Sequence, residues 1–161
     1  MDPVGARALF RFAMPFRVRF IETDAQGVVH HGTFVAYAEA ARHEYWQRLG
    51  IPRLRMAREG YDDTMVELQA RYRAPARFYD LLHVHVRTAS LGRTSFVVEF
   101  LVTRGGNEEV VAEVRSAHVI VDLQTRRPIP LPESFSRAVL TFEGSHVAVR
   151  ADQVRGLRTE V

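Results

Sequence analysis

The chain has 161 residues, of which 47% are hydrophobic and 25% are charged, and its formal net charge is +3. These values are typical of a single globular domain and not of a disordered chain. It contains no Cys, which excludes disulfides, thiolate nucleophiles and Cys-ligated zinc. All 22 basic residues are Arg, so a Schiff-base lysine is excluded as well.

Two broad classes of partner are not expected. No apolar run approaches the roughly 20 residues of a membrane-spanning helix, and the first residues lack the basic start and apolar stretch of a signal peptide. The arginines are scattered and are not interleaved with aromatic residues, which disfavours a nucleic-acid partner. We therefore expect a cytoplasmic protein with no membrane span and a small anionic molecule as its partner.

The first predicted elements are a strand and a long helix. Apolar residues alternate with arginines from Phe16 to Phe20, which indicates a strand with one buried face. From Phe34 to Leu49, apolar residues recur at spacings of three and four, which indicates an amphipathic helix. Gly50 and Pro52 then end this helix.

Strand patterns dominate the rest of the chain. Alternation predicts strands over 66–72 and 82–87, and longer strands over 94–103 and 109–121. Residues 104–107, Arg-Gly-Gly-Asn, are typical of a hairpin connection between the last two. A short helix is expected over 133–142, and the tail from Glu143 has no predicted structure. The order of one strand, one helix and several antiparallel strands predicts an α+β domain.

The most informative stretch lies between the first strand and the helix. Asp24 closes the strand, Gly27 allows a turn, and a His-His-Gly step precedes the helix. A helix start carries unpaired N–H donors and about half a positive charge. A carboxylate beside such donors is suited to acyl transfer, with the backbone amides of His31 and Gly32 as candidate oxyanion donors. The alternative is an ordinary turn or N-cap aspartate.

This stretch resembles a known family. Asp24, the Gly27-Val28-Val29 step, His31, the run from Glu39 to Glu44 and the later Arg73-Ala74-Pro75-Ala76 are similar to the signature of the 4-hydroxybenzoyl-CoA thioesterase branch of the hot-dog-fold superfamily. Within it, the chain resembles the small bacterial acyl-CoA thioesterases associated with the Tol-Pal system. The similarity runs from about residue 16 to about residue 132.

The resemblance implies both a fold and an activity. The fold would be a long central helix wrapped by an antiparallel sheet of about five strands, in a single domain over 1–161 with a C-terminal extension over 133–161. The activity would be hydrolysis of an acyl-CoA, with Asp24 as nucleophile or general base, His31 assisting, and no cofactor or metal. A homodimer or homotetramer is expected. Some close relatives carry Tyr at the position of Phe20, so a hydroxyl is absent here.

Other residues and functions stay open. Another hot-dog branch takes its carboxylate from the helix, which makes Glu39 an alternative acid, although a pair with Arg42 or His43 is the simpler reading. His83, His85 and His118 are a weak metal hypothesis. Weak candidates for the phosphates of coenzyme A are Arg71, Arg73 and Arg93. A non-catalytic acyl-CoA or acyl-carrier binding module and an arginine-rich RNA-binding domain are the alternative functions.

Overall fold

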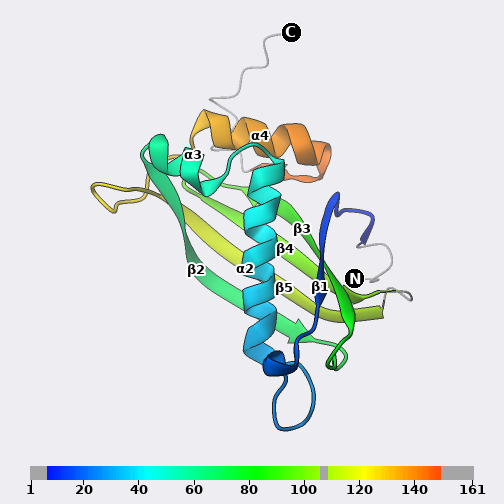
Figure 1. The fold of residues 1–161 in the computed structure, drawn as a ribbon. Coiled ribbons are helices and arrows are strands. Elements are labelled where there is room, and N and C mark those ends of the chain that lie inside the picture. Colours follow the sequence, from blue (N-terminus) through cyan, green and yellow to red (C-terminus); the bar gives the residue numbers. More distant parts are fainter. Residues whose placement is uncertain (1–6, 106–108, 150–161) are drawn as a thin grey trace. The chain divides into compact units, whose positions relative to one another are not determined.

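The structure, a computed structural model, describes residues 7–105 and 109–149. Figure 1 shows a sheet of antiparallel strands together with the long helix α2. The elements in chain order are β1 (Phe12–Arg17), the short 3-10 helix η1 (Phe20–Glu22), α2 (His31–Arg48), α3 (Arg53–Arg58), β2 (Tyr61–Tyr72), β3 (Leu81–Leu91), β4 (Ser95–Arg104), β5 (Glu109–Asp122), α4 (Glu133–Glu143), η2 (Gly144–His146) and β6 (Ala148–Val149).

The strand order is β1-β3-β4-β5-β2, with β6 pairing to β3 outside this path. β1 and β3 pair antiparallel, with Phe12 opposite Val86 and Phe16 opposite Leu82. β6 pairs with β3 in parallel over two residues. Helices and a largely antiparallel sheet confirm the predicted α+β class.

The chain divides into two compact units, and the first carries the Asp24 loop. This unit comprises residues 1–45, 69–87 and 99–115. Here α2 packs on one face of the sheet through aromatic contacts: Tyr37 stacks on Phe16 with ring centroids 4.7 Å apart, and Tyr45 meets Phe12 edge-on at 5.8 Å. Tyr37 and Tyr45 are both buried, because eight residues separate them and they lie on the same side of a 3.6-residue helix.

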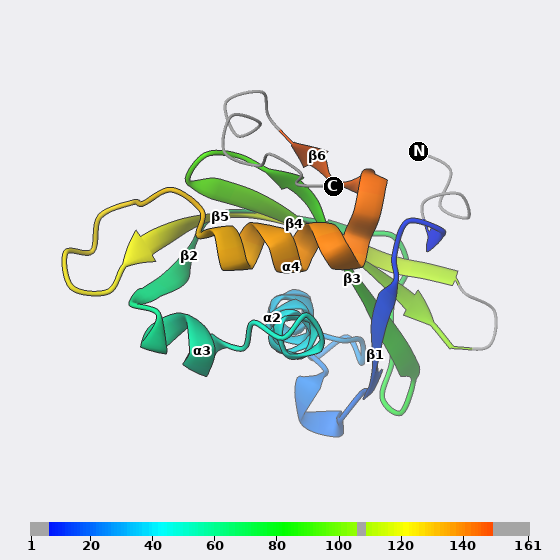
Figure 2. The ribbon, with the colours of Figure 1, turned by 90° about the horizontal axis from the view of Figure 1, so that it is seen from above.

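The second unit comprises residues 46–68, 88–98 and 116–161. Its core is aromatic: Trp46, at the end of α2, contacts Phe96 of β4 and Phe135 of α4, with ring centroids 5.7 and 5.3 Å away. All three side chains are at most 1% exposed. Figure 2 looks along α2 and shows α4 next to its end, as the contact of Trp46 with Phe135 requires.

Most predicted elements are confirmed, and the first strand is the main correction. The predicted strand over 16–20 extends past the real end of β1 at Arg17, and Phe20 begins a 3-10 helix instead. The chain turns here because the Arg19 backbone N–H donates to the Glu22 carboxylate at 2.8 Å. Phe20 is consequently 75% exposed.

The helix ends as predicted, and two predicted segments are only partly described. Gly50 has a φ of +73°, and the Ile51 N–H donates to the Trp46 carbonyl at 3.0 Å, which closes the end of α2. The predicted helix over 133–142 is α4. Residues 106–108 of the predicted hairpin, and residues 150–161 of the tail, lie outside the described residues. None of the helices in the described ranges is long and apolar enough to cross a membrane.

Candidate active site

Asp24 lies in a closed turn between η1 and α2. Its backbone N–H donates to the Val28 carbonyl at 2.8 Å, and its carbonyl accepts from the Gly27 N–H at 2.9 Å. Gly27 has a φ of +71°, a conformation that glycine adopts without a steric penalty, as the sequence predicted. The Gln26 N–H donates to Asp24 Oδ1 at 2.8 Å, and Oδ2 has no partner in the described part of the chain. The side chain is therefore held through one oxygen while the other stays available.

The start of α2 follows directly after this turn. His31 is its first residue and is exposed, with its ring stacked at a tilt on His30 at 4.1 Å between centroids. His30 Nδ1 accepts the Gly32 N–H at 3.1 Å, so a histidine takes the place of the usual Ser, Thr or Asp cap. Of the two predicted oxyanion donors, Gly32 thus already has an acceptor.

A cavity of about 460 Å³ brings the turn and the helix start together with the end of β2. Asp24 and His31 both line it, whereas Gly32 and Phe20 do not. Its walls otherwise come from the turn, from Phe34, and from the run that follows β2. That run is tied to the turn, because the Val29 N–H donates to the Ala76 carbonyl at 2.8 Å.

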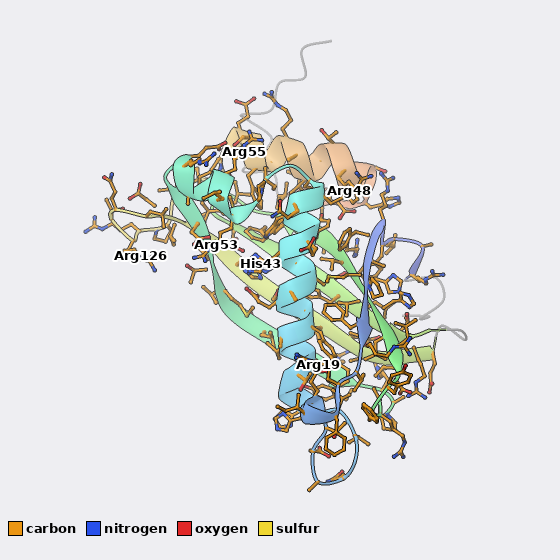
Figure 3. All side chains as sticks on the ribbon, viewed as in Figure 1. Arg19, His43, Arg48, Arg53, Arg55 and Arg126 are labelled. Carbon is orange, nitrogen blue, oxygen red and sulfur yellow. The ribbon has the colours of Figure 1, made fainter. Side chains whose placement is uncertain are left out.

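An ionic cluster, in which Glu22 and Tyr37 are buried and Arg19 is exposed, holds both ends of the Asp24 turn. Arg19 donates from Nε and Nη2 to Glu22 Oε1 at 2.9 and 2.7 Å, and the Tyr37 hydroxyl donates a short hydrogen bond to Oε2. The Glu22 carbonyl accepts the His30 N–H at 2.9 Å, which joins the start of the turn to its end. Figure 3 shows Arg19 beside the first turns of α2. This cluster fixes where the turn leaves η1 and where α2 begins.

The cluster also shifts two pKa values. Burial raises the pKa of the Glu22 carboxyl, but the hydrogen bonds from Arg19 and Tyr37 outweigh burial, and the pKa lies below its ordinary value of 4.5. Burial and the neighbouring Glu22 carboxylate raise the pKa of Tyr37 well above its ordinary value of 10. At neutral pH the cluster therefore comprises a cation, a carboxylate and a neutral phenol.

The family model of the thioesterase-like superfamily matches residues 18–139. The chain belongs to the thioesterase-like superfamily. It is 33% identical over 112 residues to a putative esterase of Aquifex aeolicus. The aligned region covers 67% of this chain and 86% of that relative. It is 31% identical over 123 residues to the acyl-CoA thioester hydrolase YbgC of Escherichia coli, which covers 76% of this chain and 91% of the relative.

Solved structures of the same superfamily share the fold. A thioesterase of Thermus thermophilus, solved with coenzyme A and zinc, is 32% identical to this chain, and the TM-score is 0.71. The match covers 84% of this chain and 96% of the Thermus thermophilus chain. The predicted hot-dog fold and the predicted membership of a thioester hydrolase family are confirmed. The hydrolase class is thereby established at the level of the family.

The three arginines predicted to bind coenzyme A phosphates lie in different parts of the structure. Arg73 lines the Asp24 cavity and also pairs with Glu113, with Nη2 2.8 Å from Oε2. Arg71 precedes it by two residues on β2 and lines a different cavity. Arg93 belongs to the second unit and lines neither cavity.

The alternative acid and the metal hypothesis can also be placed. Glu39 Oε1 lies 2.7 Å from Arg42 Nη2 and 3.2 Å from His43 Nε2, as the simpler reading predicted. His85 is buried, and its Nε2 lies 3.0 Å from Thr103 Oγ1. Across residues 7–105 and 109–149, no three His, Asp or Glu side chains form a group that could hold a metal ion.

Sequence reasoning missed two contributors to this site. Tyr72 lines the cavity, and its hydroxyl donates to the His31 carbonyl at 3.1 Å while its ring packs on Phe34 at 5.5 Å. Its position directly before Arg73-Ala74-Pro75-Ala76 was the available signal. Glu22 was not singled out either, although an Arg three residues before it on the same turn could have indicated the pair.

Proposed function

We propose that the chain is an acyl-CoA thioesterase that hydrolyses R–CO–S–CoA to a free carboxylic acid and coenzyme A. One observation carries the proposal: the Asp24 carboxylate lines a cavity at the start of α2 and has one oxygen without a partner among the described residues. The names of relatives support the substrate class, because YbgC is an acyl-CoA thioester hydrolase and the Thermus thermophilus thioesterase was solved with coenzyme A.

Two routes give the same products. As a nucleophile, Asp24 bonds to the thioester carbon, the C–S bond breaks, the thiolate leaves and takes a proton, and water then cleaves the mixed anhydride. As a general base, Asp24 takes a proton from water while the water oxygen adds to the carbon. An Asp24 hydroxamate, found in the digested protein after turnover with hydroxylamine, would identify the anhydride route.

Backbone amides at the start of α2 are the proposed oxyanion donors. The His31 residue lines the cavity, which favours its amide, whereas the Gly32 N–H donates to His30 Nδ1. Use of the Gly32 amide therefore requires the His30 ring to rotate away. One such donor is typically worth ~10²–10³ in rate. The exposed His31 ring would orient the thioester or carry a proton to the leaving thiolate.

We also propose that the protein works in the cytoplasm as a homodimer or homotetramer. The strand order places β2 at a sheet edge, and this edge strand has 12 residues. Three of its large apolar side chains are exposed: Met65 by 38%, Val66 by 62% and Tyr72 by 47%. A long edge strand with exposed apolar side chains is expected to be covered, and a second copy would provide a cover. By contrast, Phe96, Val98, Phe100 and Leu101 are buried within the chain and do not support an interface.

The test is release of free thiol across a panel of short, long and aromatic acyl-CoA substrates, with Asp24→Asn as the matched inactive variant. We expect turnover of at least one substrate by the wild type. Binding of acyl-CoA without thiol release from any substrate would replace the proposal with a binding module. Salt-sensitive RNA binding with no response to acyl-CoA would replace it with the RNA-binding alternative.

A further inference from the structure

Four large apolar side chains are exposed together in the first unit, on η1 and on the loop that joins β2 to β3. Phe20 and Ile21 of η1, and Phe78 and Tyr79 of the loop, are between 53% and 84% exposed. The Phe20 and Phe78 rings meet edge-on at 5.8 Å, and the Phe78 and Tyr79 rings are also 5.8 Å apart. We call these four residues the η1 patch. Apolar patches of this kind mark interaction sites in many proteins.

The backbone holds the loop side of the η1 patch in a fixed position. The Tyr79 N–H donates to the Val18 carbonyl at 3.0 Å, and the Val18 N–H donates to the Asp80 carbonyl at 2.9 Å. Tyr79 has a φ of +71°, which a tyrosine adopts only where its surroundings impose it. Because the rings are already ordered in the free protein, little conformational entropy is lost when they bind.

Three arginines surround the η1 patch. Arg17 donates from Nη1 to the Tyr79 carbonyl at 2.9 Å, and its Cζ lies 4.8 Å from the centre of the Tyr79 ring. Arg19 and Arg77 each directly precede a residue of the patch and are exposed. Neither Arg17 nor Arg77 has a carboxylate partner in the described part of the chain. Arg19 pairs with Glu22, which is buried. The surface is therefore apolar at its centre and cationic around it.

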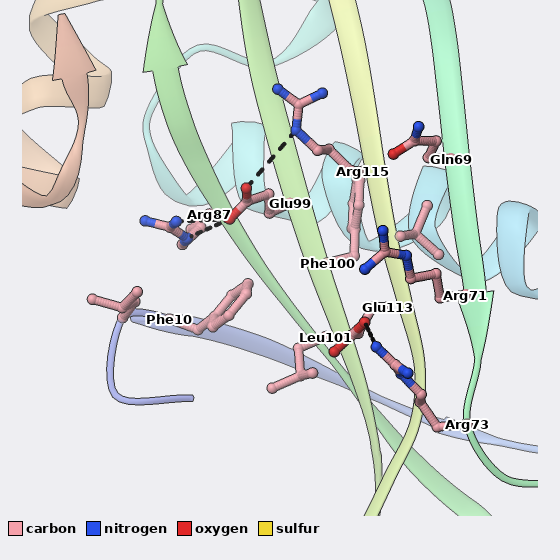
Figure 4. Close-up of a pocket in the computed structure, with 12 residues that line it drawn as sticks. Phe10, Gln69, Arg71, Arg73, Arg87, Glu99, Phe100, Leu101, Glu113 and Arg115 are labelled. Carbon is pink, nitrogen blue, oxygen red and sulfur yellow. Dashed lines mark hydrogen bonds and ion pairs between the residues drawn. The ribbon is translucent and has the colours of Figure 1, made fainter. Parts of the chain in front are cut away.

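Arginines elsewhere in the first unit are balanced by glutamates, which sets the η1 patch apart. Figure 4 shows the cavity that Arg71 lines, where Arg87 donates to Glu99 and Arg73 donates to Glu113, at 2.7 and 2.8 Å. Pairs of this kind leave little charge for an outside anion. The arginines around the patch that lack such a partner keep their charge for one.

This combination matches the surface of a membrane that contains anionic lipids. Aromatic and aliphatic side chains favour the boundary between headgroups and acyl chains, and arginines beside them reach the lipid phosphates. A second copy matches less well, because a twofold contact through the patch would set arginines against arginines. The nearby Asp80 carboxylate would not relieve this repulsion, because it already lies 3.4 Å from Arg104 Nε.

We propose that the η1 patch binds the protein reversibly to anionic membrane surfaces, with its four apolar side chains at the level of the headgroups. Insertion of apolar side chains and attraction of basic residues to anionic lipids add to each other. This binding does not depend on the proposed thioesterase function. The two are neighbours in the chain, because Ala76 lines the Asp24 cavity and lies two residues before Phe78.

The experiment is flotation of the protein with vesicles of phosphatidylcholine alone, and of phosphatidylcholine with phosphatidylglycerol, at low and high salt. We expect the wild type to bind the anionic vesicles, and to bind them less at high salt. Phe78→Ser should weaken binding at least ~10-fold, because one large apolar side chain is no longer taken out of water. Arg77→Gln should weaken it ~5-fold, as loss of one cation near an anionic surface does.

Leu54→Ser is the matched control. Leu54 is 64% exposed in the second unit and also lies between two arginines, but Arg53 pairs with Asp62 and Arg55 pairs with Glu59. The control therefore removes an exposed apolar side chain beside arginines whose charge is neutralised, and it should bind vesicles like the wild type. Thiol release without vesicles should be unchanged in Phe78→Ser, so this proposal and the thioesterase proposal can fail separately.

Fluorescence reports the insertion directly. Emission of Phe78→Trp should be quenched by lipids brominated on their acyl chains, whereas that of Leu54→Trp and of the buried Trp46 should not. No flotation of the wild type with anionic vesicles, or equal binding by Phe78→Ser and the wild type, would overturn the proposal. Salt-dependent binding without quenching would mean adsorption by charge alone and would overturn it as well. A lower molecular mass of Phe78→Ser in light scattering would assign the patch to a second copy, against the proposal.

Discussion

Among the described residues, two of the places where a carboxylate and a histidine come together have opposite surroundings. In the first unit, Asp24 and the exposed His31 line a cavity. In the second unit, His118 Nδ1 lies 3.2 Å from Asp63 Oδ2 and Nε2 lies 2.8 Å from Ser116 Oγ, the order of groups in a serine hydrolase. His118 is fully buried, Ser116 is 1% exposed, and the Phe96 ring stacks on the imidazole at 5.0 Å.

Access, and not residue type, is the reason why we assign the proposed chemistry to Asp24 and not to His118. The Ser116–His118–Asp63 arrangement has the geometry of a triad but no space for a substrate, since a core ring covers it. It satisfies polar groups inside the second unit, which is the common role of buried side chains of this kind. Asp24 has neither a serine nor an imidazole bonded to it, yet it lines a cavity together with His31, the first residue of α2.

The largest expected difference in kcat is between the variants Asp24→Asn and Ser116→Ala. The Asn variant keeps the size of the side chain and its bond to the Gln26 N–H but loses the charge that attacks carbon or accepts a proton. We expect kcat to fall by at least ~10²-fold, the low end for a positioned acid–base group. Ser116→Ala should keep wild-type kcat. The measurement is steady-state thiol release on the best substrate of the panel.

Binding and stability are the controls for this pair. Acyl-CoA should still bind to Asp24→Asn, because the start of α2 and the cavity walls are unchanged, and its melting temperature should match the wild type. Loss of turnover in Ser116→Ala with an unchanged melting temperature would show that the buried triad is the catalytic one, and would refute our assignment.

His118→Leu tests whether the buried Ser116–His118–Asp63 arrangement stabilises the fold. It removes the hydrogen bond to Ser116 and the contact with Asp63, leaving polar atoms buried without these partners. Such a loss costs about 1–3 kcal/mol in the free energy of unfolding. For a chain of this size, the melting temperature should fall by ~2–4 °C per kcal/mol. The kcat of the folded fraction should be unchanged, and a fall in kcat without a fall in stability would contradict a structural role.

Sequence patterns placed the local part of the candidate active site and missed the long-range part. Asp24, Gly27 and His31 lie within eight residues, so an aspartate, a turn and a helix start could be read together. Tyr72 joins them only because β2 ends beside α2, which no local pattern encodes. For the same reason, the alternation up to Phe20 concealed the end of β1 at Arg17: the turn depends on Glu22, which is held by Tyr37 from α2.

Glu22→Gln measures how much catalysis depends on the Arg19–Glu22–Tyr37 cluster that holds the Asp24 turn. The change removes the charge that binds Arg19 and receives the Tyr37 hydroxyl, so the turn that carries Asp24 is held less firmly. Because small displacements of a catalytic group reduce rate, we expect kcat to fall by about 10-fold. KM should change less. Ser116→Ala, which leaves this cluster intact, is the control, and wild-type kcat in Glu22→Gln would show that the cluster does not position Asp24.

The pH dependence of stability gives a second readout on Glu22. Its pKa in the folded protein lies below the ordinary value of 4.5, so its ionised form stabilises the fold. This contribution is fully present above the ordinary pKa and is lost as the pH falls through the lower, folded pKa. In urea titrations, the stability difference between wild type and Glu22→Gln should be constant near neutral pH and shrink below pH 4.5. A difference that grew towards acid pH would contradict this sign.

Glu39→Gln should have the smallest effect, although Glu39 is the carboxylate that another hot-dog branch would use. Its side chain is 41% exposed and contacts Arg42 and His43 on its own helix. The His43 side chain is 42% exposed. The pair with His43 is exposed on both sides, and such pairs contribute ~0–1 kcal/mol. Arg42 is 5% exposed, and Gln still offers an oxygen to it. We expect kcat within ~3-fold of wild type, since removal of a catalytic carboxylate would cost at least ~10²-fold. If Glu39→Gln lost turnover while Asp24→Asn kept it, with both variants melting normally, the carboxylate of the helix would be the catalytic group and the Asp24 mechanism would be wrong.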